Sequence, residues 1–148
     1  CATTYYRCFF TFFQMTSLPV ETEDRCGVIV YSKDDHGNMC VLVVKGPSGK
    51  WSFPKGKRHE DETRYDAALR ECKEETGLDL HQKISNFRVS LPYGTYYGFY
   101  YDAIYTEVPL GTPRNAAEIR EVTWKSPNEL LKCSQNMDLH TYMRRSRF

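Results

Sequence analysis

The stretch that decides the fold is GKRHEDETRYDAALRECKEETGL, residues 56–78. From Thr63 onward, residues suited to a buried stripe recur at helical spacing: Tyr65, Ala68, Leu69, Cys72 and Thr76. Thr63 suits an N-cap, and Gly77 stands where a left-handed C-terminal cap belongs. The pattern therefore predicts a helix between these two residues, preceded by a charged loop over residues 57–62.

Three glutamates of the predicted helix, Glu71, Glu74 and Glu75, project from one face, opposite the apolar stripe. Like charges at this spacing cost ~0.2–0.5 kcal/mol per pair in an isolated helix. Glu74 and Glu75 also lie in the last turn, where the helix dipole favours cations. A hard divalent cation bound by carboxylate oxygens would compensate for both effects. The alternative is a solvated face on which Arg70 and Lys73 pair with the glutamates, and the helix alone leaves both interpretations open.

Further charged and glycine residues of the stretch stand at fixed offsets from the acidic face: Gly56, Glu62, Arg70 and Gly77. Together with the three glutamates, they resemble the Nudix box of the Nudix hydrolase family. Cys72 replaces a bulky aliphatic residue of that motif, and we expect it to pack as a small hydrophobe. The resemblance implies an α/β fold, the Nudix α/β/α sandwich around a mixed β-sheet.

The resemblance also implies how the box residues would act. Carried over by position, the metal ligands would be Glu71, Glu74, Glu75 and the main-chain carbonyl of Lys55, holding one to three Mg²⁺ or Mn²⁺ ions. Glu62 and Arg70 would form a structural ion pair that orients Glu71. Water would attack a pyrophosphate bridge while a carboxylate accepts its proton.

Another acidic candidate lies near the C-terminal end of the chain. Residues 117–124, AEIREVTW, resemble the strand after which many family members carry a further glutamate near the metals. Glu118 is the first candidate for that metal ligand or general base, and Glu121 the second. A solvated strand end is the alternative for both. The catalytic carboxylate is therefore sought among Glu74, Glu75, Glu118 and Glu121.

Two short patterns bear on the substrate. Residues 51–57, WSFPKGK, are similar to a loop of mRNA-decapping Nudix enzymes and of some dinucleoside polyphosphate hydrolases. Arg114-Asn115 ahead of Glu118 also resembles the decapping pattern, with two alanines in between. The resemblance thus implies a nucleotide substrate with a polyphosphate bridge, either capped RNA or a diadenosine polyphosphate.

The candidates for substrate contacts are basic and aromatic residues near the box. Lys57 and Arg58 could touch substrate phosphates. Tyr97 and Phe99 belong to an aromatic run that could stack on bases, although alternate residues of a strand are expected in the core.

Three rival functions stay open. A diphosphoinositol polyphosphate is the alternative substrate. A Nudix-fold module could bind nucleotide or RNA without cleaving it, although such modules usually lack box carboxylates. The acidic helix could instead be a protein-interaction face, which predicts no specific Mg²⁺ binding.

Composition excludes several classes of protein. The 148 residues suit one domain. The content of 41% hydrophobic and 26% charged residues is ordinary for a globular protein and argues against a disordered, collagen-like or coiled-coil chain. Twenty Lys and Arg against 19 Asp and Glu argue against binding DNA or a membrane mainly by bulk charge. The six cysteines show no zinc spacing, so we interpret them as reduced thiols of a cytoplasmic or also nuclear protein. The oligomeric state is left open.

The remaining elements follow from alternation and turn residues. We predict strands over residues 26–31, 40–44, 51–53, 87–91, 96–105 (broken at Gly98) and 119–125, and helices over 127–132 and 138–145. We assign residues 1–25 to an N-terminal extension and residues 26–148 to a single Nudix domain.

Overall fold

The computed structural model describes residues 24–102 and 118–146. Nearly all of the expected N-terminal extension (1–25), the Arg114-Asn115 pair and the end of the strand predicted over 96–105 lie outside the described residues. In the described part, no helix combines the length and the apolar character needed to cross a membrane.

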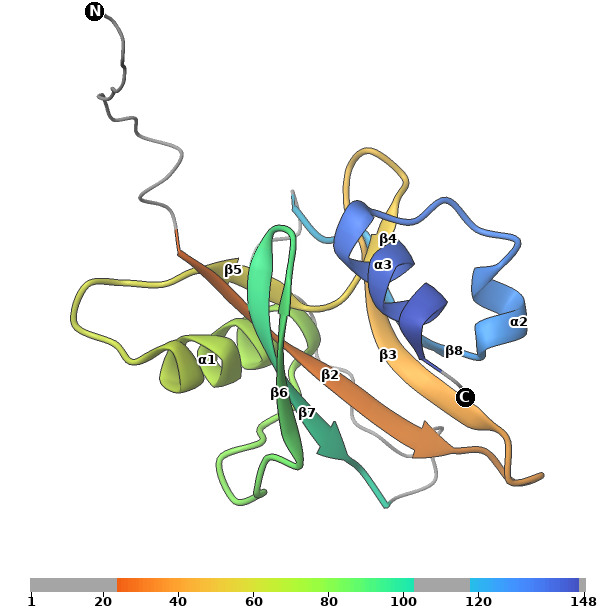
Figure 1. The fold of residues 1–148 in the computed structure, drawn as a ribbon, viewed down its shortest axis with the longest axis horizontal. Helices are drawn as coiled ribbons and strands as arrows, with labels where there is room; N and C mark the ends of the chain where they lie inside the picture. Colours follow the sequence, from red (N-terminus) through yellow and green to blue (C-terminus); the bar gives the residue numbers. More distant parts are fainter. Residues whose placement is uncertain (1–23, 103–117, 147–148) are drawn as a thin grey trace, which may run out of the picture.

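A mixed sheet forms the middle layer of the fold (Figure 1). Its described strands are β2 (Arg25–Lys33), β3 (Met39–Lys45), β4 (Trp51–Ser52), β5 (Lys55–Lys57), β6 (Phe87–Leu91), β7 (Gly94–Tyr100) and β8 (Glu121–Lys125). β2 pairs in parallel with β7, whereas its pairings with β3 and β5 are antiparallel, as are those of β3 with β8 and of β6 with β7.

Helices cover both faces of this sheet. α1 (Arg64–Thr76) packs on one face, and α2 (Pro127–Leu130) and α3 (Met137–Arg145) contribute to the cluster on the other. Alternate residues of β2 supply the two cores, with Val28 and Val30 under α1 and Ile29 against the opposite layer. The expected α/β/α sandwich is therefore confirmed.

The caps of α1 are those that the sequence predicts. The N–H of Asp66 donates to the Thr63 hydroxyl oxygen at 3.0 Å, and Gly77 adopts the left-handed region with φ of 82°. Cys72 is fully buried on the inner face of this helix. Lys57, expected in a loop, instead ends β5 because it pairs with Arg25 of β2.

The strand predicted over 96–105 differs from β7 in its bounds. β7 begins at Gly94, ends at Tyr100 and runs through Gly98 without a break. A side chain at Gly98 would overlap the ring of Phe87, its partner on β6, so the glycine makes room for that ring. Elsewhere, β8 begins at residue 121 rather than 119, and α2 ends at residue 130 rather than 132.

A buried carboxylate fastens α3 to the sheet. Asp138 is 1% exposed and accepts hydrogen bonds from the Tyr96 hydroxyl at 2.6 Å and from the Tyr93 N–H at 2.9 Å. Burial, together with the Asp138 carboxylate, raises the pKa of Tyr96. The hydroxyl therefore stays protonated and keeps donating to Asp138.

Asp138→Ala should destabilise the fold because it leaves the Tyr96 hydroxyl and the Tyr93 N–H without their acceptor. Hydrogen bonds to a charged group contribute about 1.5–3 kcal/mol each, so the loss of both should lower the free energy of unfolding by roughly 3–6 kcal/mol. Urea denaturation at pH 7 measures the change, with the exposed Asp61→Ala as the matched control. Equal stabilities of the two variants would contradict this role of Asp138.

Candidate active site

The acidic residues predicted from the sequence come together in one cavity of about 430 Å³ beside α1. Its lining comes from the loop before α1, from α1 itself and from the segment before β8: His59, Arg70, Glu71, Glu74, Glu75, Glu118 and Ile119. We call it the acidic cavity. The histidine was not singled out in the sequence, because it shows no spacing typical of a metal site.

The pairing of β3 with β8 carries Glu118 to this cavity. Lys45 faces Glu121 in the register, and the N–H of Arg120 donates to the Lys45 carbonyl at 2.8 Å. Glu118 lies next to Gly46, at the same end of β3. Glu121 forms an ion pair with the Lys45 ammonium group at 3.2 Å and does not line the cavity. Of the two candidates in this segment, the structure brings only Glu118 into the site.

The Glu62–Arg70 ion pair is present and has two contacts. The Arg70 Nε donates to one Glu62 oxygen at 2.6 Å, and its Nη2 donates to the other at 3.0 Å. This guanidinium lowers the pKa of Glu62 to about 2. Arg70 also donates to Glu71 at 3.0 Å and to Glu74 at 3.2 Å. One cation thus connects the loop to two glutamates of the acidic face.

Glu75 is the carboxylate in the least favourable environment for a negative charge. Burial, and next the charge of Glu71, raise the pKa of Glu75 to about 8, although the Lys55 N–H donates to its Oε1 at 3.3 Å. Burial raises the pKa of Glu71 as well. The two carboxylates therefore favour a proton or another positive charge beside them.

Gly56 allows Glu71 to lie directly against β5. A Cβ atom built at Gly56 would overlap the Glu71 carboxylate. The Glu71 carboxylate thus occupies the space that any side chain at position 56 would need, which explains why a glycine is required there.

The donor set of the acidic cavity fits a hard divalent cation. Carboxylate oxygens are the ligands that Mg²⁺ and Mn²⁺ prefer, and Glu71, Glu74, Glu75 and Glu118 all line the cavity. In the described part of the chain, no three acidic, His or Cys side chains converge closely enough to enclose an ion. Glu71 and Glu74 are instead bonded to Arg70. An ion bound there would compete with Arg70 for the carboxylates of these two residues.

The expected substrate contacts lie apart from the acidic cavity. Lys57 is exposed at the end of β5, and the Arg58 Nε donates to Asp24 at 3.0 Å. The Tyr97 ring is half-buried and meets the Tyr65 ring edge-on, with centroids 5.1 Å apart. Phe99 is fully buried in the core under α1, so the expectation that it contacts the substrate is wrong. Its position in β7 turns it toward the helix.

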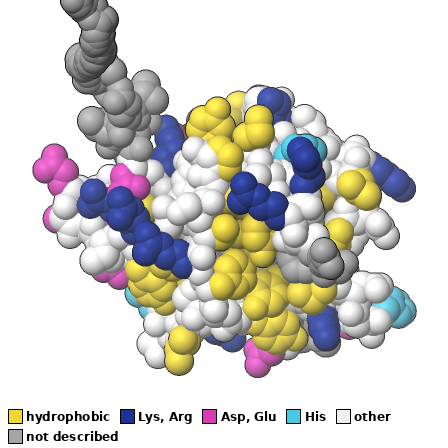
Figure 2. All heavy atoms as spheres, viewed as in Figure 1, with side chains coloured by type: hydrophobic (Ala, Val, Ile, Leu, Met, Phe, Trp, Pro, Cys, Tyr) yellow, Lys and Arg dark blue, Asp and Glu magenta, His cyan; other side chains and the backbone are white. Residues whose placement is uncertain are grey.

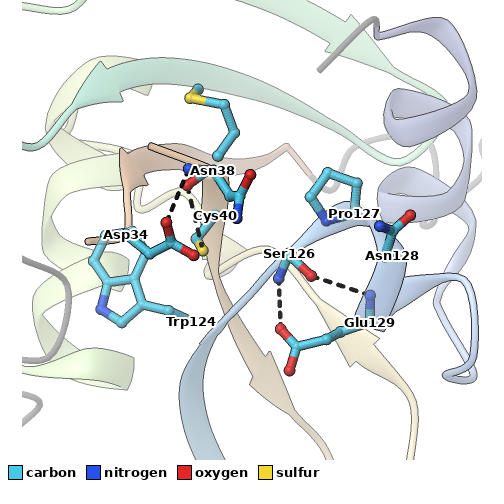
Figure 3. A pocket seen from close by; sticks show the side chains of 9 residues that line it. Asp34, Asn38, Cys40, Trp124, Ser126, Pro127, Asn128 and Glu129 are labelled. Carbon is cyan, nitrogen blue, oxygen red and sulfur yellow. Dashed lines mark hydrogen bonds between the residues drawn. The ribbon is translucent and has the colours of Figure 1, made fainter. Parts of the chain in front are cut away.

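A larger cavity of about 510 Å³ lies at the other end of β3 and β8 (Figure 3). Its polar groups already serve the local structure: Asp34 accepts from the N–H groups of His36 and Asn38, and Ser126 and Glu129 form the capping box of α2. Along the chain, residues 120–123 lie between Ile119 of the acidic cavity and Trp124 of this one. The smaller, acidic cavity is therefore the candidate active site.

Glu75→Gln should stabilise the metal-free protein in a pH-dependent way. Between the ordinary value of 4.5 and the folded value of about 8, the folded state holds a proton that the unfolded chain has released. The free energy of unfolding of the parent protein therefore falls as the pH rises through this window. The glutamine of the variant does not ionise, so its free energy of unfolding does not fall in this window. The variant should be more stable than the parent by roughly 1–3 kcal/mol at pH 8 and nearly equal to it at pH 4.5. Urea denaturation in EDTA tests this, and an equal difference at both pH values would contradict it.

Comparison with known proteins agrees with the geometry of the site. Residues 22–145 match the family model of the NUDIX domain. The mRNA-decapping enzyme subunit 2 of Arabidopsis thaliana is 31% identical over 117 residues, which cover 72% of this chain and 29% of that protein. The m7GpppN-mRNA hydrolase of Saccharomyces cerevisiae is 31% identical over 70% of this chain and 11% of its own length. The chain thus spans less than a third of these relatives.

Among solved structures, a C. elegans Ap4A hydrolase in a binary complex superposes with a TM-score of 0.65. The two are 18% identical, and the match covers 83% of this chain and 93% of that one, so the likeness shows a shared fold. Since the family model spans most of the chain and its box glutamates share one cavity, this protein belongs to the Nudix family.

Proposed function

We propose that this chain is a metal-dependent pyrophosphohydrolase that cleaves the phosphoanhydride bridge of capped RNA and releases methylated GDP. The observation that carries the reaction class is that Glu71, Glu74, Glu75 and Glu118 all line one cavity. The choice of capped RNA is supported by the decapping relatives, which are 31% identical over about 70% of this chain.

The residues that would hold Mg²⁺ or Mn²⁺ are Glu71, Glu74, Glu75 and the main-chain carbonyl of Lys55. When bound, such ions neutralise the charge of the phosphate bridge and lower the pKa of the attacking water. The chain prepares the site for them in two ways. Gly56 lets Glu71 approach the β5 backbone, and the Glu62–Arg70 ion pair fixes the loop beside it.

Glu118 is the proposed general base for the attacking water. It is exposed at the wall of the acidic cavity, and no basic side chain of the described residues is paired with it. Glu74, in contrast, is held by Arg70 at 3.2 Å, and Glu75 is bonded to the Lys55 N–H. Among the four glutamates that line the cavity, Glu118 is therefore the one that no Arg, Lys or main-chain N–H of the described residues holds in place, and Glu74 and Glu75 serve mainly as ligands.

Two rival functions differ from this proposal in their substrate, and a third lacks catalysis. A diadenosine polyphosphate contains the same type of bridge, whereas a diphosphoinositol polyphosphate would leave the tyrosines near the site without a role. A non-catalytic module is disfavoured because every box carboxylate is present. We further propose residues 26–148 as the catalytic domain of a cytoplasmic protein, supported by the free thiols of Cys26, Cys40, Cys72 and Cys133.

Mg²⁺-dependent release of methylated GDP from cap-labelled RNA tests the proposal. Glu75→Gln should abolish turnover by removing a ligand. Glu118→Gln should lower kcat by roughly 10²–10⁴-fold, the usual contribution of a general base. The exposed loop variant Glu60→Gln is the matched control and should retain activity.

Diadenosine tetraphosphate and diphosphoinositol polyphosphate are assayed in parallel. Cleavage of either small substrate without cleavage of capped RNA would overturn capped RNA as the substrate. If none of the three substrates is cleaved, the proposal that the chain is a hydrolase is overturned. An active Glu75→Gln enzyme would overturn the assignment of Glu75 as a metal ligand.

A further inference from the structure

A second groove lies on the other side of the loop that precedes α1. Its volume is about 440 Å³, and three arginines and two tyrosines dominate its lining: Arg58, Arg64, Arg88, Tyr65 and Tyr97. We call it the arginine–tyrosine groove. Figure 2 shows Lys and Arg side chains following one another over the side of the molecule that carries α1 and β5, with hydrophobic side chains beside them.

The loop before α1 contributes residues to both this groove and the acidic cavity. Arg58 lines the groove, whereas its neighbour His59 lines the cavity. Glu62 lines the groove while its carboxylate binds Arg70 of the cavity wall. A substrate whose bond is cut in the cavity could therefore continue across the loop into the groove.

The arginines of the groove carry more positive charge than their partners neutralise. Arg58 and Arg64 share a single carboxylate, Asp24, each through a contact of 3.0 Å. Arg88 is exposed on β6 and has no acidic partner in the part of the chain that the structure describes. The groove thus attracts anions, in contrast to the four glutamates of the neighbouring cavity.

The aromatic part of the groove offers planar surfaces next to these charges. Arg88 and Tyr97 are direct cross-strand partners of β6 and β7, and the Arg88 guanidinium lies over the Tyr97 ring at 5.9 Å from its centroid. Tyr65 supports the same ring edge-on, at 89°. Nucleic-acid bases stack both on aromatic rings and on guanidinium planes.

We infer that the arginine–tyrosine groove binds single-stranded RNA next to the bond that is cut, with Arg64 and Arg58 on a phosphate and Tyr97 with Arg88 stacked on a base. The position along the substrate rests on the proposed function, because it assumes that the bridge is cut in the acidic cavity. The binding itself does not require hydrolysis. Phosphates alone would explain the arginines but not the half-buried tyrosine rings beside them.

Fluorescence anisotropy with a labelled, uncapped, unstructured RNA of about ten nucleotides tests this inference in EDTA, where no turnover occurs. Arg64→Gln should flatten the slope of log Kd against log salt by about 0.7, the value for one phosphate contact on a single strand. Tyr97→Leu should weaken binding about fivefold or more with the slope unchanged, because a stacking contact is lost while the apolar packing is kept.

Arg145→Gln, which removes an exposed arginine of α3 in the opposite layer, is the matched control and should bind like the parent. Thermal melts establish that each variant is folded. Unchanged affinity and slope in both groove variants would overturn the inference. So would a loss of affinity in Arg145→Gln equal to theirs, because it would indicate diffuse charge attraction. If inorganic triphosphate displaces the RNA tightly and Tyr97→Leu has no effect on RNA binding, the groove is only an anion site. That result would also contradict the inference.

Failure of this inference can be told apart from failure of the proposed function. If the parent protein releases methylated GDP while both groove variants bind RNA normally, only the groove assignment fails. If the groove variants lose RNA binding while the parent cleaves none of the three substrates, only the hydrolase proposal fails.

Discussion

The two-contact ion pair between Arg70 and Glu62 is the interaction on which the site depends. It closes the loop of residues 58–63 onto α1, and the same guanidinium holds Glu71 and Glu74. Both side chains of the pair are largely shielded, with 23% and 16% exposure, so removing one partner would leave a poorly solvated charge on the other. The loop that this pair fixes is also the wall between the acidic cavity and the arginine–tyrosine groove.

Charge is divided unevenly across that wall, and the division suits a polyanionic substrate. On one side, burial and the charge of Glu71 raise the pKa of Glu75 to about 8, so a negative charge is unfavourable there unless a proton or a cation is bound. On the other side, Arg58 and Arg64 share one aspartate, which leaves net positive charge on that surface. Affinity for the body of the substrate and chemistry on its bridge can therefore come from separate surfaces.

The sequence predicted what local patterns determine. The caps of α1, the burial of Cys72 and the shared face of the three helix glutamates all follow from spacing within one helix. Glu118 was reached only through a family resemblance, because its place depends on the register of β3 with β8. Phe99 was misplaced, since an aromatic run does not reveal which alternate residues face the core. The groove and the Asp138–Tyr96 contact needed the pairing of β7 with its neighbours, which no local signal reports.

The central claim is that the glutamates of the acidic cavity are arranged to hold a divalent cation, and calorimetric titration with Mn²⁺ tests it most directly. Gly56→Ala would push the Glu71 carboxylate away from β5, whereas a Cβ at Gly46 would meet only the Glu118 carbonyl at an ordinary 3.6 Å. We predict that the parent and Gly46→Ala bind Mn²⁺ alike and that Gly56→Ala binds about tenfold more weakly or worse, the usual cost of disturbing a metal ligand. Equal affinities of all three proteins, or no binding by the parent, would contradict the account.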